Sequence, residues 1–468
     1  MKETDQIETL TALADAKRDR KSHSLASVRV SPGPYLAVAS VLTFLGAMLV
    51  RSNREGWALL LICIAWLIVP ALAFTDRIVF DGGSIRRQGP ISALMGLIYG
   101  YRKHLNISDF ELLETHAVRT LRRGGSVRYR YRTQIIGRGK EFVIASGGHG
   151  YRKLIRELLP LIHEDKLDNR TRDLRDYLND PAAVSNKAKL SMLASEDVLD
   201  LTSADRKPHR KQQLQPAVVE AHDLERAHLL RRLGNELRVT GRLKEAAEAF
   251  RRALNVTPQA SWLLYDLARL LRSQASAQGD ARLLSRARAA LRLARTRANG
   301  DVVLLPLIGE SFLECGDTRQ ARRVLQETVD LDYGNYKARL GLADLSLREG
   351  KLAHVIHHYH EAARVTSETA LARYARREAD YYTLLNDDED YLVTELRRIS
   401  WLQNVTRVRR MSGRVTSVAI VTAIIGGFLD PLAGSIGWSL ASSALILWLL
   451  SVVVTRLLFS RSKPESVA

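Results

Sequence analysis

The chain has 468 residues and a formal net charge of +19, with 70 lysines and arginines against 51 acidic residues. This length is too great for a single domain. The positive charge suits an anionic membrane surface or a nucleic acid, but it does not specify a fold. Only two cysteines occur, Cys63 and Cys315, which excludes a disulfide framework and a cysteine-rich metal site.

Four apolar stretches stand in two close pairs. The first pair covers residues 34–50 and 57–74, and the second covers residues 415–429 and 436–458. A membrane-spanning helix needs roughly 20 apolar residues, with about 17 as a lower limit. We therefore expect two transmembrane helical hairpins, at residues 34–75 and 411–459. The alternative is that some stretches are buried core helices, and the short third stretch fits a span least well.

Basic residues mark one side of both pairs. Lysines and arginines precede the first and third stretches and follow the second and fourth, whereas the connection 430–435 has none. Basic flanks stay in the cytoplasm. The pattern predicts a cytoplasmic N-terminal tail at residues 1–33, a cytoplasmic C-terminal tail at residues 460–468, and a cytoplasmic middle region.

Residues 76–165 carry a pattern of strands followed by one helix. The strands are predicted at Ile78–Phe80, Ser84–Arg86, Ile107–Glu114, Val127–Gln134 and Glu141–Ile144, and the helix at Tyr151–His163. This order, placed after an apolar hairpin, resembles the bacterial pleckstrin-homology (PH)-like membrane proteins. The resemblance implies a bent β-barrel closed by a C-terminal helix, no catalytic residues, and a place at the bacterial plasma (inner) membrane.

One predicted strand in this region has a basic face. Strand alternation puts Arg128, Arg130 and Arg132 on one face and the tyrosines Tyr129 and Tyr131 on the other. Two interpretations remain open. The arginines form either a solvated strand face or a surface that contacts anionic membrane lipids.

Residues 166–222 are polar and have few aromatic side chains. We expect a continuation of the preceding helix as far as Leu178, which Asn179-Asp180-Pro181 ends. From Ala182 to about Pro216 we expect a flexible linker, in which Ser195–Leu201 has the composition of a short helix.

A repeat begins after this linker. Ala227–Pro258 has small, large apolar and turn residues at the positions Leu230, Leu233, Gly234, Leu237, Gly241, Leu243, Ala246, Phe250, Ala253 and Pro258. It resembles a tetratricopeptide repeat (TPR). The pattern returns in Val302–Tyr333 and Tyr336–Ser367, with a divergent copy at Ser261–Gly300 and a weaker helical pair at Ala370–Trp401. The resemblance implies an α-solenoid over residues 223–402 with a concave face.

In this family the first helix of each repeat lines the concave face, which commonly grips a peptide or a helix. The candidate groove residues are Arg231, Asn235, Arg238, Glu310 and Asp344. Arg231 and Asn235 match the first positions of the family's carboxylate clamp. However, Asp266 stands in place of the next asparagine, and Val303 and Leu307 replace its basic pair, so we do not expect a carboxylate clamp.

The sequence offers no pattern for catalysis. It lacks the phosphate-binding GxxxxGK[ST] loop and the GxSxG nucleophile turn. His354 and His358 have the spacing of a zinc pair, but without further ligands they indicate surface or inter-helix packing. We therefore expect a protein that is not an enzyme and has no cofactor and no metal.

Taken together, the patterns predict a multi-domain α+β membrane protein. We expect a membrane-anchored scaffold whose cytoplasmic TPR solenoid binds a protein or peptide partner, with the PH-like domain positioned at the membrane. The alternative is a regulatory or structural subunit of a membrane transporter or channel complex. Nucleic-acid binding is not expected, because aromatic and basic residues alternate only in Val127–Arg132.

Overall fold

A computed structural model describes residues 25–30, 33–90, 93, 104–121, 127–145, 149–193, 221–429 and 431–458. The chain divides into two compact units. The first unit contains Met1–Ser31 and Thr75–Asp380, and the second contains Pro32–Phe74 and Tyr381–Ala468.

Two antiparallel sheets form the β domain of the first unit. One sheet has the order β1 (Ala26–Arg29), β2 (Arg77–Phe80), β3 (Ser84–Gln88) and β4 (His104–Asn106). The other has the order β5 (Leu112–Leu121), β6 (Val127–Gly137) and β7 (Lys140–Ala145). Tight turns join β2 to β3 and β6 to β7, where Gly82 and Gly139 have φ angles of 92° and 69° that favour glycine.

The predicted strand pairs at Ile78–Arg86 and Val127–Ile144 form antiparallel β-hairpins, and two details of the β domain differ from the prediction. The predicted strand at Ile107–Glu114 is wrong at its start, because Ile107–Asp109 forms a 3₁₀ turn (η2) and β5 begins only at Leu112. Strand β1 was not predicted. It pairs with β2 across the whole first apolar hairpin, with Ala26 opposite Phe80, and a local pattern does not reveal a partner so distant in the chain.

One helix, α6 (His149–Leu158), packs its apolar face onto the β-domain core. Tyr151, Leu154, Ile155 and Leu158 of this helix are buried in one cluster with strand residues such as Phe80. The predicted continuous helix to Leu178 is wrong. Pro160 lies in a 3₁₀ turn (η3, Leu159–Leu161), a second such turn follows (η4, Glu164–Lys166), and a new helix α7 (Asn169–Tyr177) begins after Asp168.

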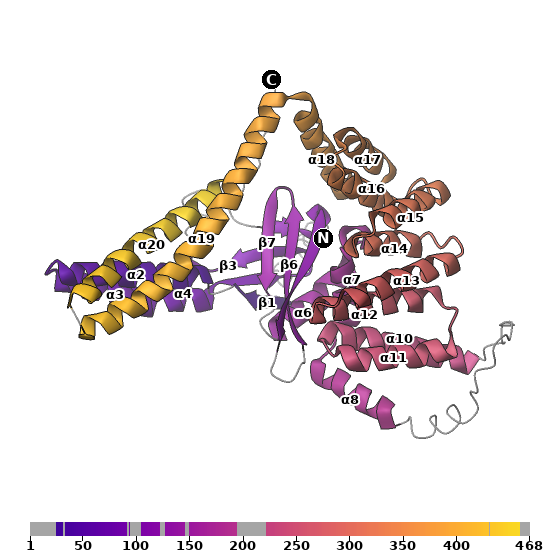
Figure 1. The fold of residues 1–468 in the computed structure, drawn as a ribbon, viewed down its shortest axis with the longest axis horizontal. Helices are drawn as coiled ribbons and strands as arrows, with labels where there is room; N and C mark the ends of the chain where they lie inside the picture. Colours follow the sequence, from indigo (N-terminus) through magenta and orange to yellow (C-terminus); the bar gives the residue numbers. More distant parts are fainter. Residues whose placement is uncertain are drawn as a thin grey trace, which may run out of the picture. The chain divides into compact units, whose positions relative to one another are not determined.

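Paired helices stack one after another in a TPR-like solenoid (Figure 1). The pairs are α10 (Ala221–Thr240) with α11 (Leu243–Val256), α12 (Ser261–Gln278) with α13 (Ala281–Arg297), α14 (Leu304–Glu314) with α15 (Thr318–Leu331), and α16 (Tyr336–Arg348) with α17 (Leu352–Val365). Helix α18 (Thr369–Asp387) follows them. The predicted packing is confirmed at the first pair. Ala246 and Phe250 are fully buried, and a Cβ atom on Gly234 would lie 2.9 Å from the ring of Phe250.

Helix α8 (Pro181–Leu193) occupies part of the predicted flexible linker. Pro181 at its first position suits a helix start. Val184 and Ala188 are buried in one cluster with Leu237 of α10 and residues of α11. The apolar face of α8 therefore caps the first helical pair, which explains why the linker prediction is wrong for this segment. The predicted short helix at Ser195–Leu201 lies outside the described residues.

The second unit consists of helices. The first hairpin contains α2 (Gly33–Arg51) and a continuous helical run made of α3 (Glu55–Cys63), the π-helical turn η1 (Ile64–Ile68) and α4 (Val69–Thr75). The π turn precedes Pro70, whose ring excludes regular α-helical hydrogen bonding to the preceding turn. The run Glu55–Thr75 has 21 residues and is long and apolar enough to cross a membrane.

The second hairpin of this unit contains α19 (Glu389–Leu429) and α20 (Pro431–Leu458). The predicted separation between a helix ending at Trp401 and an apolar helix starting at Val415 is wrong, since α19 is one helix of 41 residues. Its central part contains no proline to interrupt it. The two hairpins of the unit contact each other, and the rings of Phe44 and Trp438 lie 6.3 Å apart. Shorter apolar helices cover Val38–Val50 and Ile436–Trp448.

Candidate functional site

Three of the candidate groove residues, Arg231, Asn235 and Arg238, lie on α10. Arg231 donates a hydrogen bond from Nε to Oδ2 of Asp266 on α12 at 2.5 Å, and the Asn235 amide donates to the same oxygen at 2.9 Å. The Arg231 guanidinium also lies over the ring of Trp262, 5.2 Å from its centre. The Asp266 carboxylate therefore accepts hydrogen bonds from both residues that match a carboxylate clamp. This gives a physical reason why position 266 carries aspartate and not asparagine.

Helix α7 of the same chain contacts both α10 and α12. Asp173 on α7 accepts two hydrogen bonds from Arg238, at 2.7 and 3.0 Å, and one from Arg269 at 2.5 Å. Arg269 also donates to the backbone oxygen of Asn169 at 3.1 Å. The side chains of Asp173, Arg238 and Arg269 are no more than 8% exposed. The candidate groove residue Arg238 is thus already bound to a helix of the same chain.

Against the effect of burial, the arginines of this cluster lower the pKa of its acidic residue, Asp173. Burial by itself raises the pKa of Asp173, but the nearby guanidinium groups of Arg238 and Arg269 more than offset this, and the pKa lies below its ordinary value. For Arg269, burial alone lowers the pKa, and the charge of Asp173 raises it above its ordinary value. Asp173 is therefore ionised at neutral pH and tied to two cations.

Hydrogen bonding around α7 is incomplete. Asn169 Nδ2, Arg172 Nε and Arg269 Nε are buried and have no hydrogen-bond partner among the described residues. A buried polar atom without a partner costs about 1–3 kcal/mol. The ion pairs of Asp173 with Arg238 and Arg269 therefore contribute most of the polar stabilisation between α7 and the solenoid.

Glu310 of α14 joins this cluster, whereas Asp344 does not. Burial, with a smaller contribution from Asp168, raises the pKa of Glu310 to about 7, against the opposing charges of Arg172 and Arg269. Asp344 of α16 is exposed and pairs with Arg348 one turn away on its own helix, at 2.9 Å. The structure therefore brings four of the five candidate groove residues to one place.

Further contacts between the β domain and the solenoid were not expected from the sequence. Glu111 accepts a hydrogen bond from Arg377 of α18 at 2.8 Å, across 266 positions of sequence. Lys166 forms an ion pair with Glu368 at 3.0 Å. The Tyr131 hydroxyl donates to the backbone oxygen of Val239 on α10. The β domain and the turn after α6 thus contact the repeats at α10, at Glu368 and at α18.

On strand β6, the predicted alternation places the arginines and tyrosines in different surroundings. Arg130 and Arg132 are exposed, and the Arg128 side chain lies outside the described residues. Tyr131, on the other face, packs against the β-domain core and α10. Contact of the arginines with anionic lipid stays a prediction.

The histidine segment forms part of an open hollow. His354, His357 and His358 of α17 line it together with Arg322 and residues of α16, and its volume is about 600 Å³. Burial and the neighbouring His357 lower the pKa of His358 to about 4, so this imidazole is neutral at physiological pH. In the described part of the chain, no three histidine, cysteine or acidic side chains are placed to hold a metal ion.

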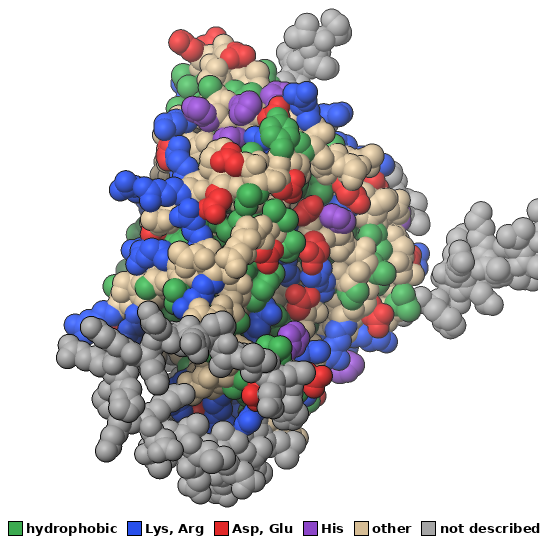
Figure 2. Space-filling model, turned by 90° about the vertical axis from the view of Figure 1, so that its right-hand side faces the viewer, with side chains coloured by type: hydrophobic (Ala, Val, Ile, Leu, Met, Phe, Trp, Pro, Cys, Tyr) green, Lys and Arg blue, Asp and Glu red, His purple; other side chains and the backbone are tan. Residues whose placement is uncertain are grey.

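An exposed apolar patch lies at the solenoid edge. Val302 and Val303 precede α14, and Leu331 and Tyr333 precede α16; they are 36–61% exposed. Asn335 donates a hydrogen bond to the backbone oxygen of Val302 at 3.2 Å, which holds the two turns together. We call these four residues the edge patch. On the face of the molecule that Figure 2 shows, acidic, basic and apolar side chains are interspersed.

Comparisons with known proteins identify repeat proteins only at low similarity. No protein-family model matches the chain, and no characterised protein sequence is similar to it. A thermophilic TPR protein of Thermus thermophilus, TTC0263, is 18% identical, with a TM-score of 0.30, and the match covers 35% of this chain and 84% of that one. MamA is 15% identical, with a TM-score of 0.26, covering 35% and 96%. The Cut9-Hcn1 tetramer of APC/C is 12% identical, with a TM-score of 0.29, covering 66% and 52%. Similarities at this level assign no function, and the repeat architecture rests on the chain's own helices.

Proposed function

We propose that this protein is a membrane-anchored scaffold whose TPR-like solenoid binds a protein partner on the cytoplasmic side of a bacterial plasma membrane. The observation that carries the proposal is the edge patch. Four large apolar side chains remain exposed at one edge of the solenoid, whereas the candidate groove residue Arg238 is already bound to Asp173 of α7. Exposed apolar side chains that lie together mark protein contact sites.

Membrane anchoring by both hairpins is part of this proposal. The run Glu55–Thr75 supports it by length and composition. The exposed apolar residues of the second unit add further support, since Leu59 and Leu67 are 68% and 69% exposed and Val418 is 67% exposed. Side chains of this kind on a helical hairpin are stable in lipid and costly in water.

A PH-like character of the β domain is also proposed. Its supports are a four-stranded and a three-stranded antiparallel sheet in sequence order, followed by one helix that packs onto their shared core. In this proposal the domain holds the solenoid near the membrane, and Arg128, Arg130 and Arg132 contact anionic headgroups. Hydrogen exchange of β6 in the full chain should be slower in nanodiscs of anionic lipid than of neutral lipid, and R128Q/R130Q/R132Q should abolish the difference.

Site-specific photo-crosslinking tests the scaffold function in native membranes. A photoreactive amino acid replaces Val303 in the edge patch or, as a matched control, the exposed Lys244 of α11. We expect a covalent adduct with a second protein at position 303 and none at position 244. The adduct should disappear when Leu331→Asp makes the patch polar. Equal adducts at both positions, or no adduct at the patch, would contradict the proposal.

A further inference from the structure

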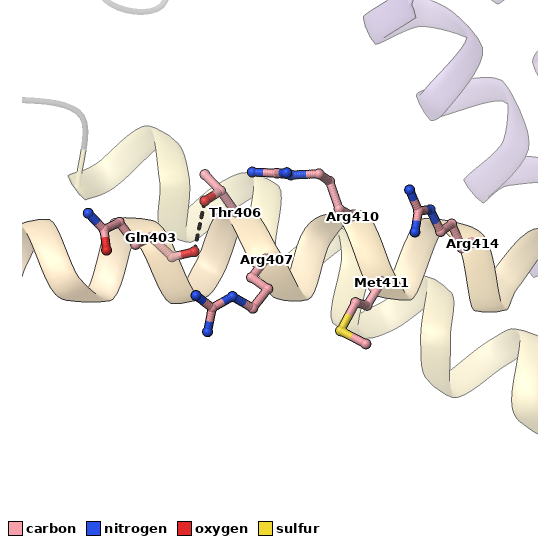
Figure 3. Close-up of a pocket in the computed structure, with 6 residues that line it drawn as sticks. All are labelled: Gln403, Thr406, Arg407, Arg410, Met411 and Arg414. Carbon is pink, nitrogen blue, oxygen red and sulfur yellow. Dashed lines mark hydrogen bonds between the residues drawn. The ribbon is translucent and has the colours of Figure 1, made fainter.

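Helix α19 carries arginines at the point where its sequence changes from polar to apolar. Arg407, Arg410 and Arg414 are exposed, and with Gln403, Thr406 and Met411 they line an open hollow of about 410 Å³ (Figure 3). At 100° per residue the three arginines fall within an arc of about 60° around the helix. The three arginine side chains therefore leave α19 on one face, and their guanidinium groups spread around the hollow, with Arg407 below the helix and Arg410 and Arg414 above it in Figure 3.

These arginines differ from those of the solenoid. Arg238 and Arg269 are tied to Asp173, and on α19 itself Arg398 is tied to Glu395. Among the described residues, no ion pair or hydrogen bond involves the guanidinium of Arg407, Arg410 or Arg414. Three cations around one hollow without a carboxylate leave their positive charge uncompensated, so an anion that binds in the hollow gains from each of them.

An apolar stripe continues the same face of the helix. Val418, Val421 and Ile425 are 67%, 55% and 55% exposed. By the same helical geometry they lie over the arc that the arginines occupy, beginning about one turn beyond Arg414. A ligand that fits both parts has a negatively charged head and a long apolar tail.

From this arrangement we propose that α19 carries a binding site for an anionic phospholipid. The headgroup phosphate binds among Arg407, Arg410 and Arg414, and an acyl chain lies along Val418, Val421 and Ile425. Guanidinium groups form charge-assisted, often bidentate hydrogen bonds with phosphate oxygens. The site rests on the proposed membrane anchoring, because only a chain in a bilayer meets this ligand at high local concentration.

Native mass spectrometry of the full-length protein tests the site. The protein is purified in detergent, exposed to phosphatidylglycerol or phosphatidylcholine with identical acyl chains, and scored for retained lipid. We expect the wild type to retain phosphatidylglycerol preferentially. In R407Q/R410Q this preference should fall by roughly tenfold or more, since each basic residue near an anionic lipid surface contributes about fivefold.

A matched double variant controls for charge. R397Q/R409Q also removes two positive charges from α19, but Arg409 lies about 100° from Arg410 and outside the arc; its retention should equal that of the wild type. V418S/V421S should weaken retention of both lipids. The proposal is overturned by equal losses in the two arginine variants, by equal retention of the two lipids in the wild type, or by full displacement of lipid with inorganic phosphate, which would indicate a site for a soluble anion.

Failure of the membrane proposal gives a different result. A protein that is recovered from cells without detergent would contradict the anchoring, whatever its arginines bind. A protein that needs detergent, but retains lipid equally well in R407Q/R410Q and R397Q/R409Q, would remove only the lipid site.

Discussion

Asp173 and Arg238 form a two-point contact, in which both guanidinium NH₂ groups donate to the two carboxylate oxygens at 2.7 and 3.0 Å. The pair joins α7 to α10 in a buried setting, and Arg269 adds a second cation. Removing one member of a buried ion pair leaves an uncompensated charge, which costs more than the pair contributes when intact.

Asp173→Asn should therefore destabilise the full-length protein by about 3–5 kcal/mol, because Arg238 and Arg269 would stay buried without their anion. Chemical unfolding in detergent, followed by circular dichroism, measures the change. Asp176→Asn is the control on the same helix. Its carboxylate is 37% exposed beside Arg175, and exposed pairs contribute about 0–1 kcal/mol. Similar losses in the two variants would contradict the role given to Asp173.

The same pair predicts a dependence on acid. The pKa of Asp173 is lower in the folded state than in the unfolded chain, so its stabilising contribution is complete above the unfolded pKa of about 3.9 and is lost as the pH falls through the folded value. The difference in stability between wild type and Asp173→Asn should be constant at neutral pH and shrink below about pH 4. A difference that stays constant into acid would speak against an ionised Asp173.

The raised pKa of Glu310 predicts that stability depends on pH in the opposite direction. Burial raises its pKa to about 7, so the folded protein binds this proton more tightly than the unfolded chain does. Stability then falls as the pH rises from about 4.5 to 7. Glu310→Gln should stabilise the full-length protein by roughly 1–3 kcal/mol at pH 8 and have little effect at pH 4. Thermal unfolding at both pH values checks this, and an equal effect at both would refute it.

Ala246→Phe tests the packing of the first repeat. Ala246 is fully buried between α10 and α11, and extra volume in a close-packed core costs about 1–3 kcal/mol. The same residue introduced at the exposed Lys244 should change stability by no more than about 0.5 kcal/mol. If both variants unfold at the same denaturant concentration as the wild type, the helices do not pack in this register.

Cysteine labelling tests the orientation in the membrane. In a background without Cys63 and Cys315, Ser52→Cys places a thiol in the turn of the first hairpin and Ser285→Cys places one on exposed α13. An impermeant reagent added to cells with a permeabilised outer membrane should label position 52 and leave position 285 unlabelled until the inner membrane is opened. Labelling of position 285 in intact inner membranes would reverse the assigned topology.

Local sequence patterns predicted most helices and strands, but they did not predict contacts between residues that are far apart in the chain. Helical spacing placed the TPR-like pairs, and Gly82 and Gly139 marked two hairpins, because each of these features is decided within a few residues. The sequence around Asp173 looks like an ordinary polar helix, since its partners Arg238 and Arg269 lie far along the chain. One signal was available but was interpreted only as the loss of a carboxylate clamp: Asp266 stands in place of a clamp asparagine, and in the structure it is the partner of Arg231.

The pairing of β1 with β2 also sets an order on folding. The register that places Arg29 opposite Arg77, and the hydrogen bond from the Val30 N–H to the backbone oxygen of Asp76, close a loop that contains the whole first hairpin. During synthesis β1 leaves the ribosome first and must wait for the hairpin and β2 to follow, so until then its backbone is open to pairing with other chains. If the hairpin inserts into a bilayer first, its two ends lie side by side at the membrane surface. Most of the conformational entropy of the loop is then lost before β1 pairs with β2. Insertion into the membrane would then act as a folding step for the cytoplasmic β domain.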